Sequence, residues 1–307
     1  MRECYDLIVV GGGPAGYTAA LYGARVGLSV LVLEMLSPGG QMATTSRIDN
    51  FPGLAAGADG FAIGEQMQAA AEAFGAKSLF AEVTALELRT QPKTVTTSEG
   101  TFAARAVILA TGAAPRRLGL PGEDALAGRG ISYCATCDGM FYKGKTVAVL
   151  GGGNTAAAEA LELAHLCEKV YLVHRRDTLR ADAIYEAPLR AARNIECIWN
   201  KQILALEHGD VLTGLRLKDT VTGAESTLAV DGAFVAIGRA PNTALAEGQL
   251  ALAPGGYIPA GENTATAIPG VYAAGDLRTK PLRQIVTAAA DGAVAATQAA
   301  AWLRAQP

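Results

Sequence analysis

Two apolar runs, each ending in a glycine-rich turn, organise the chain. Residues 6–16 read DLIVVGGGPAG, and residues 146–163 read TVAVLGGGNTAAAEALEL. Each run has the pattern of a short buried strand, a tight turn and a helix with small residues on one face. A second apolar strand follows each helix, SVLVLE at 29–34 and VYLVH at 170–174. Strands that alternate with helices in this way predict an α/β fold with parallel sheets.

The glycine spacing in each turn fits a dinucleotide-binding turn. Gly11-x-Gly13-x-x-Gly16 would allow the turn, the approach of a pyrophosphate to the backbone, and close packing of helix on strand. Such a turn can also be purely structural. The repeat, Gly151-x-Gly153-x-x-Ala156, lies at an offset of 140 residues. Free N–H groups at the two helix N-termini would bind phosphates. The turn residues expected to contribute are Gly11, Gly13, Pro14, Ala15 and Gly16 in the first copy and Gly151, Gly153, Asn154 and Thr155 in the second.

A second pair of matching segments predicts the domain organisation. VILATGAAPR at 107–116 resembles FVAIGRAPN at 234–242, with Gly112 and Gly238 in equivalent places. Two dinucleotide-binding units in one chain imply two dinucleotides. Because the chain continues well past residue 242, we expect its C-terminal segment to return and complete the first unit. The predicted domains are 1–113 with 244–307, and 117–241, joined by short crossings that Pro115 and Pro241 stiffen.

Composition excludes several classes of protein. The 307 residues are 50% apolar and 18% charged, which suits two folded domains rather than a disordered chain. A net charge of −3 gives no support for a nucleic-acid partner. No stretch resembles a membrane span or a signal peptide. Five cysteines are an odd, low count typical of a reducing compartment, so we expect a cytoplasmic protein.

The residue at the end of the second strand of each unit indicates which dinucleotide that unit binds. Glu34 would accept hydrogen bonds from free ribose hydroxyls and repel a 2′-phosphate, which suits the adenosine of FAD. The equivalent position in the second unit is His174, followed by Arg175, Arg176 and Arg180. Arginines bind phosphate through charge-assisted hydrogen bonds, so this cluster suits the 2′-phosphate of NADPH. The alternative is a solvated basic start to a helix.

The remaining candidate for a catalytic site is a CxxC motif followed by an acid, Cys134-Ala135-Thr136-Cys137-Asp138. A zinc site would need further ligands, and the sequence has no second CxxC, so no metal is expected. A structural disulfide would close too small a loop to stabilise much. A redox-active dithiol needs two sulfurs in reach and a nearby proton donor, and this interpretation uses all three residues.

The three histidines narrow the choice of proton donor. His165, His174 and His208 all lie outside the C-terminal hundred or so residues, which excludes a disulfide reductase with a C-terminal catalytic His. Asp138 is then the economical general acid, because shielding from water raises the pKa of a carboxyl. Cys4, Cys167 and Cys197 are solitary, and we expect them to be inert.

Together these motifs resemble the low-molecular-weight bacterial thioredoxin reductases over essentially the whole chain. The resemblance is carried by GGGPAG, GGQM at 39–42, ATG at 110–112, YCATCDG at 133–139, GGGNTA, HRRDTLR at 174–180, AAGD at 273–276 and RQIVTAAADGA at 283–293. It implies a homodimer in which an NADPH domain is inserted into a discontinuous FAD domain and rotates relative to it. It adds to the FAD contacts Gly40, Gln41, Asn50, Thr111, Gly112, Asp276, Arg283 and Gln284.

The resemblance also implies the electron path. Electrons would pass from NADPH to FAD, then to a Cys134–Cys137 disulfide, then to thioredoxin. Cys137 would face the flavin, Cys134 would exchange with thioredoxin, and Asp138 would handle protons. One position departs from the pattern, because many members carry a Glu pair where this chain has Ala158-Glu159.

Three other interpretations compete with this one. The first is a relative that reduces another dithiol protein or takes electrons from ferredoxin, although a ferredoxin-dependent enzyme would not need the HRRDTLR cluster. The similar alkyl-hydroperoxide-reductase flavoprotein has an extra N-terminal redox domain, whereas the first glycine turn is reached here at residue 11. A non-catalytic redox sensor need not retain Cys134, Cys137 and Asp138 together.

Overall fold

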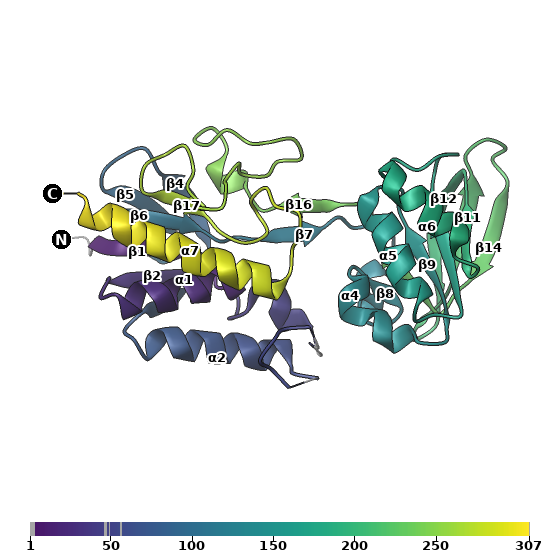
Figure 1. The fold of residues 1–307 in the computed structure, drawn as a ribbon, viewed down its shortest axis with the longest axis horizontal. Helices are drawn as coiled ribbons and strands as arrows, with labels where there is room; N and C mark the ends of the chain where they lie inside the picture. Colours follow the sequence, from purple (N-terminus) through teal and green to yellow (C-terminus); the bar gives the residue numbers. More distant parts are fainter. Residues whose placement is uncertain (1–3, 46–47, 49, 56, 307) are drawn as a thin grey trace. The chain divides into compact units, whose positions relative to one another are not determined.

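The computed structural model describes residues 4–45, 48, 50–55 and 57–306. The chain folds into two compact units. Unit 1 is Met1–Ala114 with Ala240–Pro307, and unit 2 is Pro115–Arg239 (Figure 1). Each unit is built around its own sheet, and the second is therefore an insertion in the first along the chain.

Unit 1 contains a seven-stranded sheet in the order β3-β2-β1-β6-β5-β4, with β17 also paired to β6. Its N-terminal part is parallel, and β4, β5 and β6 pair in antiparallel fashion. The strands are β1 (Cys4–Val10), β2 (Val30–Glu34), β3 (Lys77–Phe80), β4 (Val83–Glu87), β5 (Lys93–Thr97), β6 (Gly100–Leu109) and β17 (Val271–Ala273). The helical elements are α1 (Pro14–Arg25), η1 (Gly40–Thr44), α2 (Gly60–Glu72), η4 (Ala244–Ala246) and α7 (Ile285–Arg304).

The C-terminal segment completes this sheet. Strand β17 pairs with β6 in parallel, with Tyr272 opposite Ile108. Helix α7 lies beside α1 on the same face of the sheet (Figure 1). A Cβ on Gly292 of α7 would overlap the Ala15 carbonyl of α1, so the two helices pack backbone to backbone there. Small residues in both helices make this contact possible.

Unit 2 contains a five-stranded parallel sheet in the order β11-β10-β9-β15-β8 and a three-stranded antiparallel sheet, β12-β13-β14. The strands are β8 (Ile131–Ser132), β9 (Thr146–Leu150), β10 (Lys169–Val173), β11 (Ile195–Ile198), β12 (Lys201–His208), β13 (Leu212–Asp219), β14 (Glu225–Ala229) and β15 (Gly232–Val235). The helical elements are α3 (Glu123–Leu126), α4 (Ala135–Asp138), η2 (Gly139–Tyr142), α5 (Asn154–Ala164), η3 (Ala183–Tyr185) and α6 (Glu186–Ala191).

The two crossings between the units pair with each other. Strands β7 (Ala113–Pro115) and β16 (Arg239–Pro241) form a two-stranded sheet. Asn242 Nδ2 donates to the Thr111 carbonyl at 2.9 Å, and Thr111 Oγ1 donates to the Asn242 carbonyl at 2.5 Å. The chain therefore enters and leaves unit 2 through one hydrogen-bonded ribbon.

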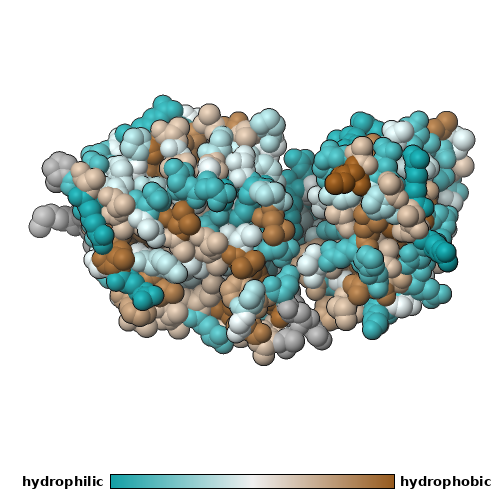
Figure 2. Space-filling view, in the orientation of Figure 1, coloured by the Kyte–Doolittle hydropathy of each residue, from teal (hydrophilic) through white to brown (hydrophobic). Residues whose placement is uncertain are grey.

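Strand boundaries differ slightly from the sequence prediction. Strand β2 begins at Val30, and β10 ends at Val173, so His174 is the first residue beyond its strand. In the described part of the chain, no helix is both long enough and apolar enough to span a membrane. On the face drawn in Figure 2, apolar residues are interspersed with polar ones on each unit.

Candidate cofactor sites and redox centre

The first glycine turn has the close contacts that its spacing predicts. Gly11 adopts a positive φ of +106°, and a Cβ on Gly16 would overlap the Gly11 carbonyl oxygen, so neither position accepts a side chain. Gly13 is different, because the atom nearest to a Cβ there is the Gly39 carbonyl oxygen, 3.9 Å away. Gly13 precedes the twelve-residue helix α1, and among the described residues no side chain caps it. Backbone N–H groups and open space are what a bound pyrophosphate requires.

Glu34 lies at the edge of this turn. Its Oε2 accepts a 2.7 Å hydrogen bond from Gly12 N, and its Oε1 accepts one of 3.1 Å from Leu36 N. These contacts fix the carboxylate and use one lone-pair site on each oxygen, which leaves capacity for two ribose hydroxyls. The residues present therefore fit the adenosine end of FAD.

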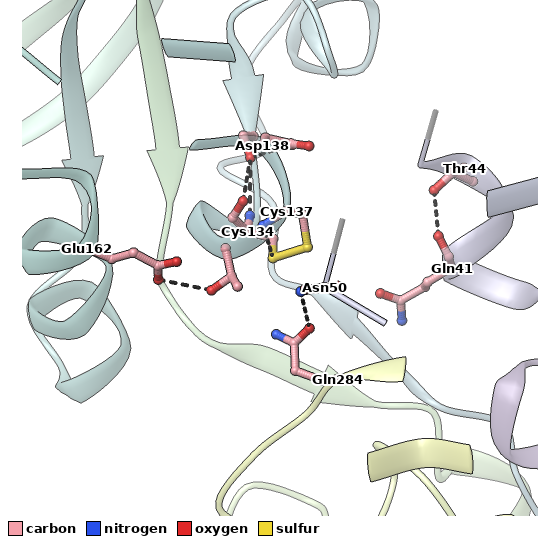
Figure 3. Close-up of a disulfide and its surroundings, with 10 residues drawn as sticks. Gln41, Thr44, Asn50, Cys134, Cys137, Asp138, Glu162 and Gln284 are labelled. Carbon is pink, nitrogen blue, oxygen red and sulfur yellow. Dashed lines mark hydrogen bonds between the residues drawn. A yellow bond between two sulfur atoms is a disulfide. The ribbon is translucent and has the colours of Figure 1, made fainter. Parts of the chain in front are cut away.

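Several other predicted FAD residues are brought together within unit 1, although they are far apart in sequence. Asn50 Nδ2 donates to Gln284 Oε1 at 3.2 Å (Figure 3). Gln41 Nε2 donates to the Ala113 carbonyl, which follows Gly112. Thr44 Oγ1 donates to the Gln41 carbonyl at 2.9 Å, which holds the η1 turn.

The last predicted group, Asp276, Arg283 and Gln284, lies where the C-terminal segment meets the glycine turn. A Cβ on Gly275 would lie 3.0 Å from Ala15 Cβ, so Asp276 is next to the start of α1. Arg283 Nε donates to the Asp276 carbonyl at 3.3 Å, and its guanidinium lies 4.2 Å from the centre of the Tyr257 ring. Gln284 begins α7 with a reciprocal capping interaction to Thr287.

The second glycine turn in unit 2 repeats this arrangement. A Cβ on Gly151 would overlap the Ala236 carbonyl oxygen, whereas no described atom lies within 4 Å of a Cβ on Gly153. Gly153 precedes the eleven-residue helix α5, which no side chain of the described residues caps. Asn154 Nδ2 donates to Asp182 Oδ2 at 2.7 Å, which holds the loop after Arg180 against the helix start.

The basic cluster surrounds this turn. The His174 ring is buried and occupies the space where a Cβ on Gly152 would be, while Arg175, Arg176 and Arg180 are exposed. Arg180 N donates to the Gly152 carbonyl at 2.6 Å. Burial, together with the three guanidinium groups, lowers the pKa of His174. A fixed positive potential at this strand end fits an added 2′-phosphate.

Cys134 and Cys137 form a disulfide in unit 2, with Cα atoms 5.3 Å apart (Figure 3). Cys134 caps the four-residue helix α4, and its Sγ accepts from Cys137 N at 3.2 Å. Both residues are half-buried. The other three cysteines carry free thiols, and burial raises the pKa of Cys167 to about 11, which suppresses its thiolate.

Asp138 lies at the end of the same short helix. Its backbone N donates to the Cys134 carbonyl at 3.1 Å, and its Oδ2 accepts a 2.7 Å hydrogen bond from Ser132 Oγ. Burial raises the pKa of Asp138, and the Ser132 hydrogen bond opposes that shift. The raised pKa keeps the carboxyl protonated to higher pH than an exposed aspartic acid, as a proton donor requires.

The structure adds three residues that sequence reasoning missed. Ser132 donates a hydrogen bond to Asp138 and also accepts one from Cys134 N at 3.2 Å. Its position two residues before the CxxC motif was the only feature of the sequence that could have indicated this role. Arg278 and Lys280 converge on buried Asp291, which anchors the segment carrying Asp276 to α7. No sequence spacing indicated that network.

Comparisons with known proteins identify the family of the chain. Residues 5–292 match the pyridine nucleotide-disulphide oxidoreductase family. The chain is 45% identical over 306 residues to a thioredoxin reductase from Mycolicibacterium smegmatis, covering 99% of this chain and 98% of that one. It is 44% identical to a thioredoxin reductase from Streptomyces coelicolor, covering 99% and 96%. The crystal structure of thioredoxin reductase from Streptococcus pyogenes is similar with a TM-score of 0.89 and 36% identity, covering both chains completely.

The fold, the disulfide beside the half-buried Asp138 and the full-length similarity at this identity all point to one family. The chain belongs to the thioredoxin reductases of the pyridine nucleotide-disulphide oxidoreductase family.

Proposed function

We propose that this chain uses NADPH to reduce thioredoxin, with FAD bound in unit 1 and the Cys134–Cys137 pair as the exchanging disulfide. The observation that carries the proposal is the disulfide beside Asp138, whose pKa burial raises. The overall reaction balances as NADPH, one proton and thioredoxin disulfide giving NADP⁺ and thioredoxin dithiol. By the same resemblance the enzyme is a cytoplasmic homodimer.

The FAD site is proposed for the residues gathered around the first glycine turn. Backbone N–H groups at the start of α1 bind the pyrophosphate, and Glu34 accepts hydrogen bonds from the ribose. The rest of the cofactor is bound by the hydrogen-bonded pair of Asn50 and Gln284 and by five further residues of unit 1. These are Gln41, Thr111, Gly112, Asp276 and Arg283. When bound, FAD supplies a two-electron relay between nicotinamide and disulfide.

The NADPH site is proposed for the second turn. The start of α5 binds the pyrophosphate, and Arg175, Arg176 and Arg180 pair with the 2′-phosphate. His174 packs under the turn and holds the strand end at which the arginines begin. Its lowered pKa keeps it neutral, so the phosphate charge is met by the guanidinium groups.

In the disulfide steps, two electrons break the Cys134–Cys137 bond and Asp138 supplies a proton to the sulfur that leaves as thiolate. Asp138 takes that proton back as Cys134 Sγ attacks the thioredoxin disulfide, which forms a mixed disulfide and releases one thioredoxin thiolate, which is then protonated. Cys137 Sγ attacks Cys134 Sγ, which releases the second thioredoxin sulfur and restores the original pair. Ser132 keeps Asp138 beside the cysteines throughout.

The test is an anaerobic titration of the purified yellow protein with NADPH and separately with NADH, followed at the flavin absorption band. We expect NADPH to bleach the flavin at far lower concentration than NADH, and oxidised thioredoxin to restore the colour. Failure of both nucleotides would mean another electron donor, such as ferredoxin. Bleaching without recovery on adding thioredoxin would mean another disulfide substrate or a sensor.

A further inference from the structure

Helix α5 packs closely against the turn that carries the two redox cysteines, residues 134–139. Ala135, buried at 2% exposure, packs in one apolar cluster with Ala156, Ala160 and Leu163 of α5. A Cβ on Gly139 would lie 3.2 Å from Leu163 Cδ2, tighter than ordinary contact. The cysteine-bearing turn therefore has little freedom to move away from this helix.

Two carboxylates of α5 contact that turn, and they differ in burial. Glu162 Oε2 accepts from Thr136 Oγ1 at 2.9 Å in an exposed hydrogen bond (Figure 3). Glu159 accepts from the backbone N–H of Ala135, next to Cys134. Its Oε2 is buried and has no hydrogen-bond partner among the described residues. A buried carboxylate oxygen left unsatisfied is costly, and the proposed steps give this residue no role.

The charged groups around Glu159 come from three elements. Arg239 of β16 favours its ionised form, and Glu162 of its own helix opposes it. Helix α4 carries the cysteine pair and Asp138, whose carboxylate is bonded to Ser132. Burial is the largest influence and raises the pKa of Glu159 to about 7, while the Ala135 N–H and Arg239 oppose the rise. Its charge therefore changes in the pH range where thiols exchange.

We propose that Glu159 is a positioning residue for the redox pair, which fixes the Ala135 backbone beside Cys134 and whose carboxylate charge opposes formation of the Cys134 thiolate. This inference rests on the proposed function. A negative charge near a thiol disfavours its ionised form. Proton binding at Glu159 then increases the thiolate available for attack on thioredoxin, so the residue couples proton binding to disulfide exchange.

The experiment uses the FAD-bound protein, reduced with dithiothreitol, and measures alkylation of Cys134 by iodoacetamide from pH 5.5 to 9.5, read by mass spectrometry of the Cys134 peptide. In Glu159→Gln, which keeps an acceptor for Ala135 N–H but removes the charge, the alkylation midpoint should fall by about one pH unit. Above about pH 7, where Glu159 of the wild type is ionised, and below the midpoint, this approaches a tenfold gain in rate. Below pH 7 the two profiles should converge, because Glu159 then holds its proton. Glu159→Asp should restore most of the wild-type profile.

Glu162→Gln is the matched control, since it removes a carboxylate from the same helix one turn away. Its alkylation midpoint should not fall, because removing the Glu162 charge favours the ionised form of Glu159. Glu159→Leu provides a second neutral variant, because burying an apolar side chain of similar volume carries no desolvation cost. It should show the same lowered midpoint, even if Glu159→Gln does not fold.

Two results would overturn the inference. One is an unchanged midpoint in both neutral variants, and the other is a faster reaction at every pH with no shift of midpoint, which indicates loosened packing alone. Failure of the proposed function is separate, because it would appear in the wild type as no bleaching by NADPH or no reoxidation by thioredoxin. The alkylation profile depends on neither.

Discussion

Gly12 N donates a 2.7 Å hydrogen bond to Glu34 Oε2, and at the equivalent place in unit 2 the His174 ring packs against Gly152. The two nucleotide turns thus share a backbone framework and differ in the residue that closes it. Unit 1 presents the anchored carboxylate of Glu34 at this position. Unit 2 presents the buried His174 ring, flanked by exposed arginines, so the two turns carry opposite charges there. This contrast carries the proposed choice of cofactors.

Replacing both Arg175 and Arg176 by Ala should raise the KM for NADPH far more than the KM for NADH. Each charge-assisted hydrogen bond lost costs about 1.5–3 kcal/mol, which corresponds to about 10- to 150-fold in affinity. Steady-state reduction of thioredoxin with each nucleotide measures the effect. Arg193→Ala, an exposed arginine in the same unit, is the control. Equal changes for both nucleotides would show that the cluster does not read the 2′-phosphate.

Much of the fold was accessible from sequence because the repeated turns are local. Gly11, Gly16 and Gly151 have steric reasons that depend on their own turn or on the end of a neighbouring strand. The predicted disulfide partners, three residues apart, are joined in the structure. The C-terminal return was also expected, and β17 pairs with β6.

What sequence could not supply is contact between distant segments. Asn50 meets Gln284 across 234 residues, and Glu159 reaches the backbone of Ala135 from another helix. Neither contact leaves a spacing in the sequence, because each depends on how helices pack on a sheet. Burial is equally hidden, so the raised pKa of Glu159 could not be predicted from residue type.

Cys134→Ser should abolish reduction of thioredoxin while NADPH still bleaches the flavin. The substitution removes the sulfur proposed to attack thioredoxin but leaves both nucleotide turns unchanged. Turnover and anaerobic bleaching, measured on the same preparation, separate the two half-reactions. Cys4→Ser, at an exposed free thiol, should retain both. Undiminished turnover by the Cys134 variant would disprove the dithiol mechanism.

Asp138→Asn should lower thioredoxin turnover by about 10²- to 10⁴-fold, the usual contribution of a positioned general acid. Burial raises the pKa of Asp138, so its carboxyl holds a proton to higher pH in the folded protein. Wild-type turnover should therefore fall as pH rises through that pKa. The variant, whose amide does not titrate, should lose this limb of the pH profile. A variant that keeps the limb would assign the proton to another group.

Asp291→Asn should destabilise unit 1 by about 3–5 kcal/mol, because it leaves Arg278 and Lys280 facing a neutral group in a buried site. Burial alone would raise the pKa of Asp291, but hydrogen bonds from Arg278, Lys280 and Gly275 N hold it below the ordinary value. A carboxyl whose pKa is lower in the folded than in the unfolded protein stabilises the folded state at pH values above its unfolded pKa. That stabilisation is lost as the pH falls through the pKa of the folded state.

The difference between wild type and Asp291→Asn should accordingly be largest near neutral pH and shrink below about pH 4, toward and through the folded pKa. Urea unfolding followed by the fluorescence of released flavin measures it. Asp59→Asn is the control: Asp59 caps α2 by accepting from Ala62 N at 2.9 Å, and Asn caps helices equally well. A pH-independent difference would mean that packing around α7, rather than the ion network, holds this segment in place.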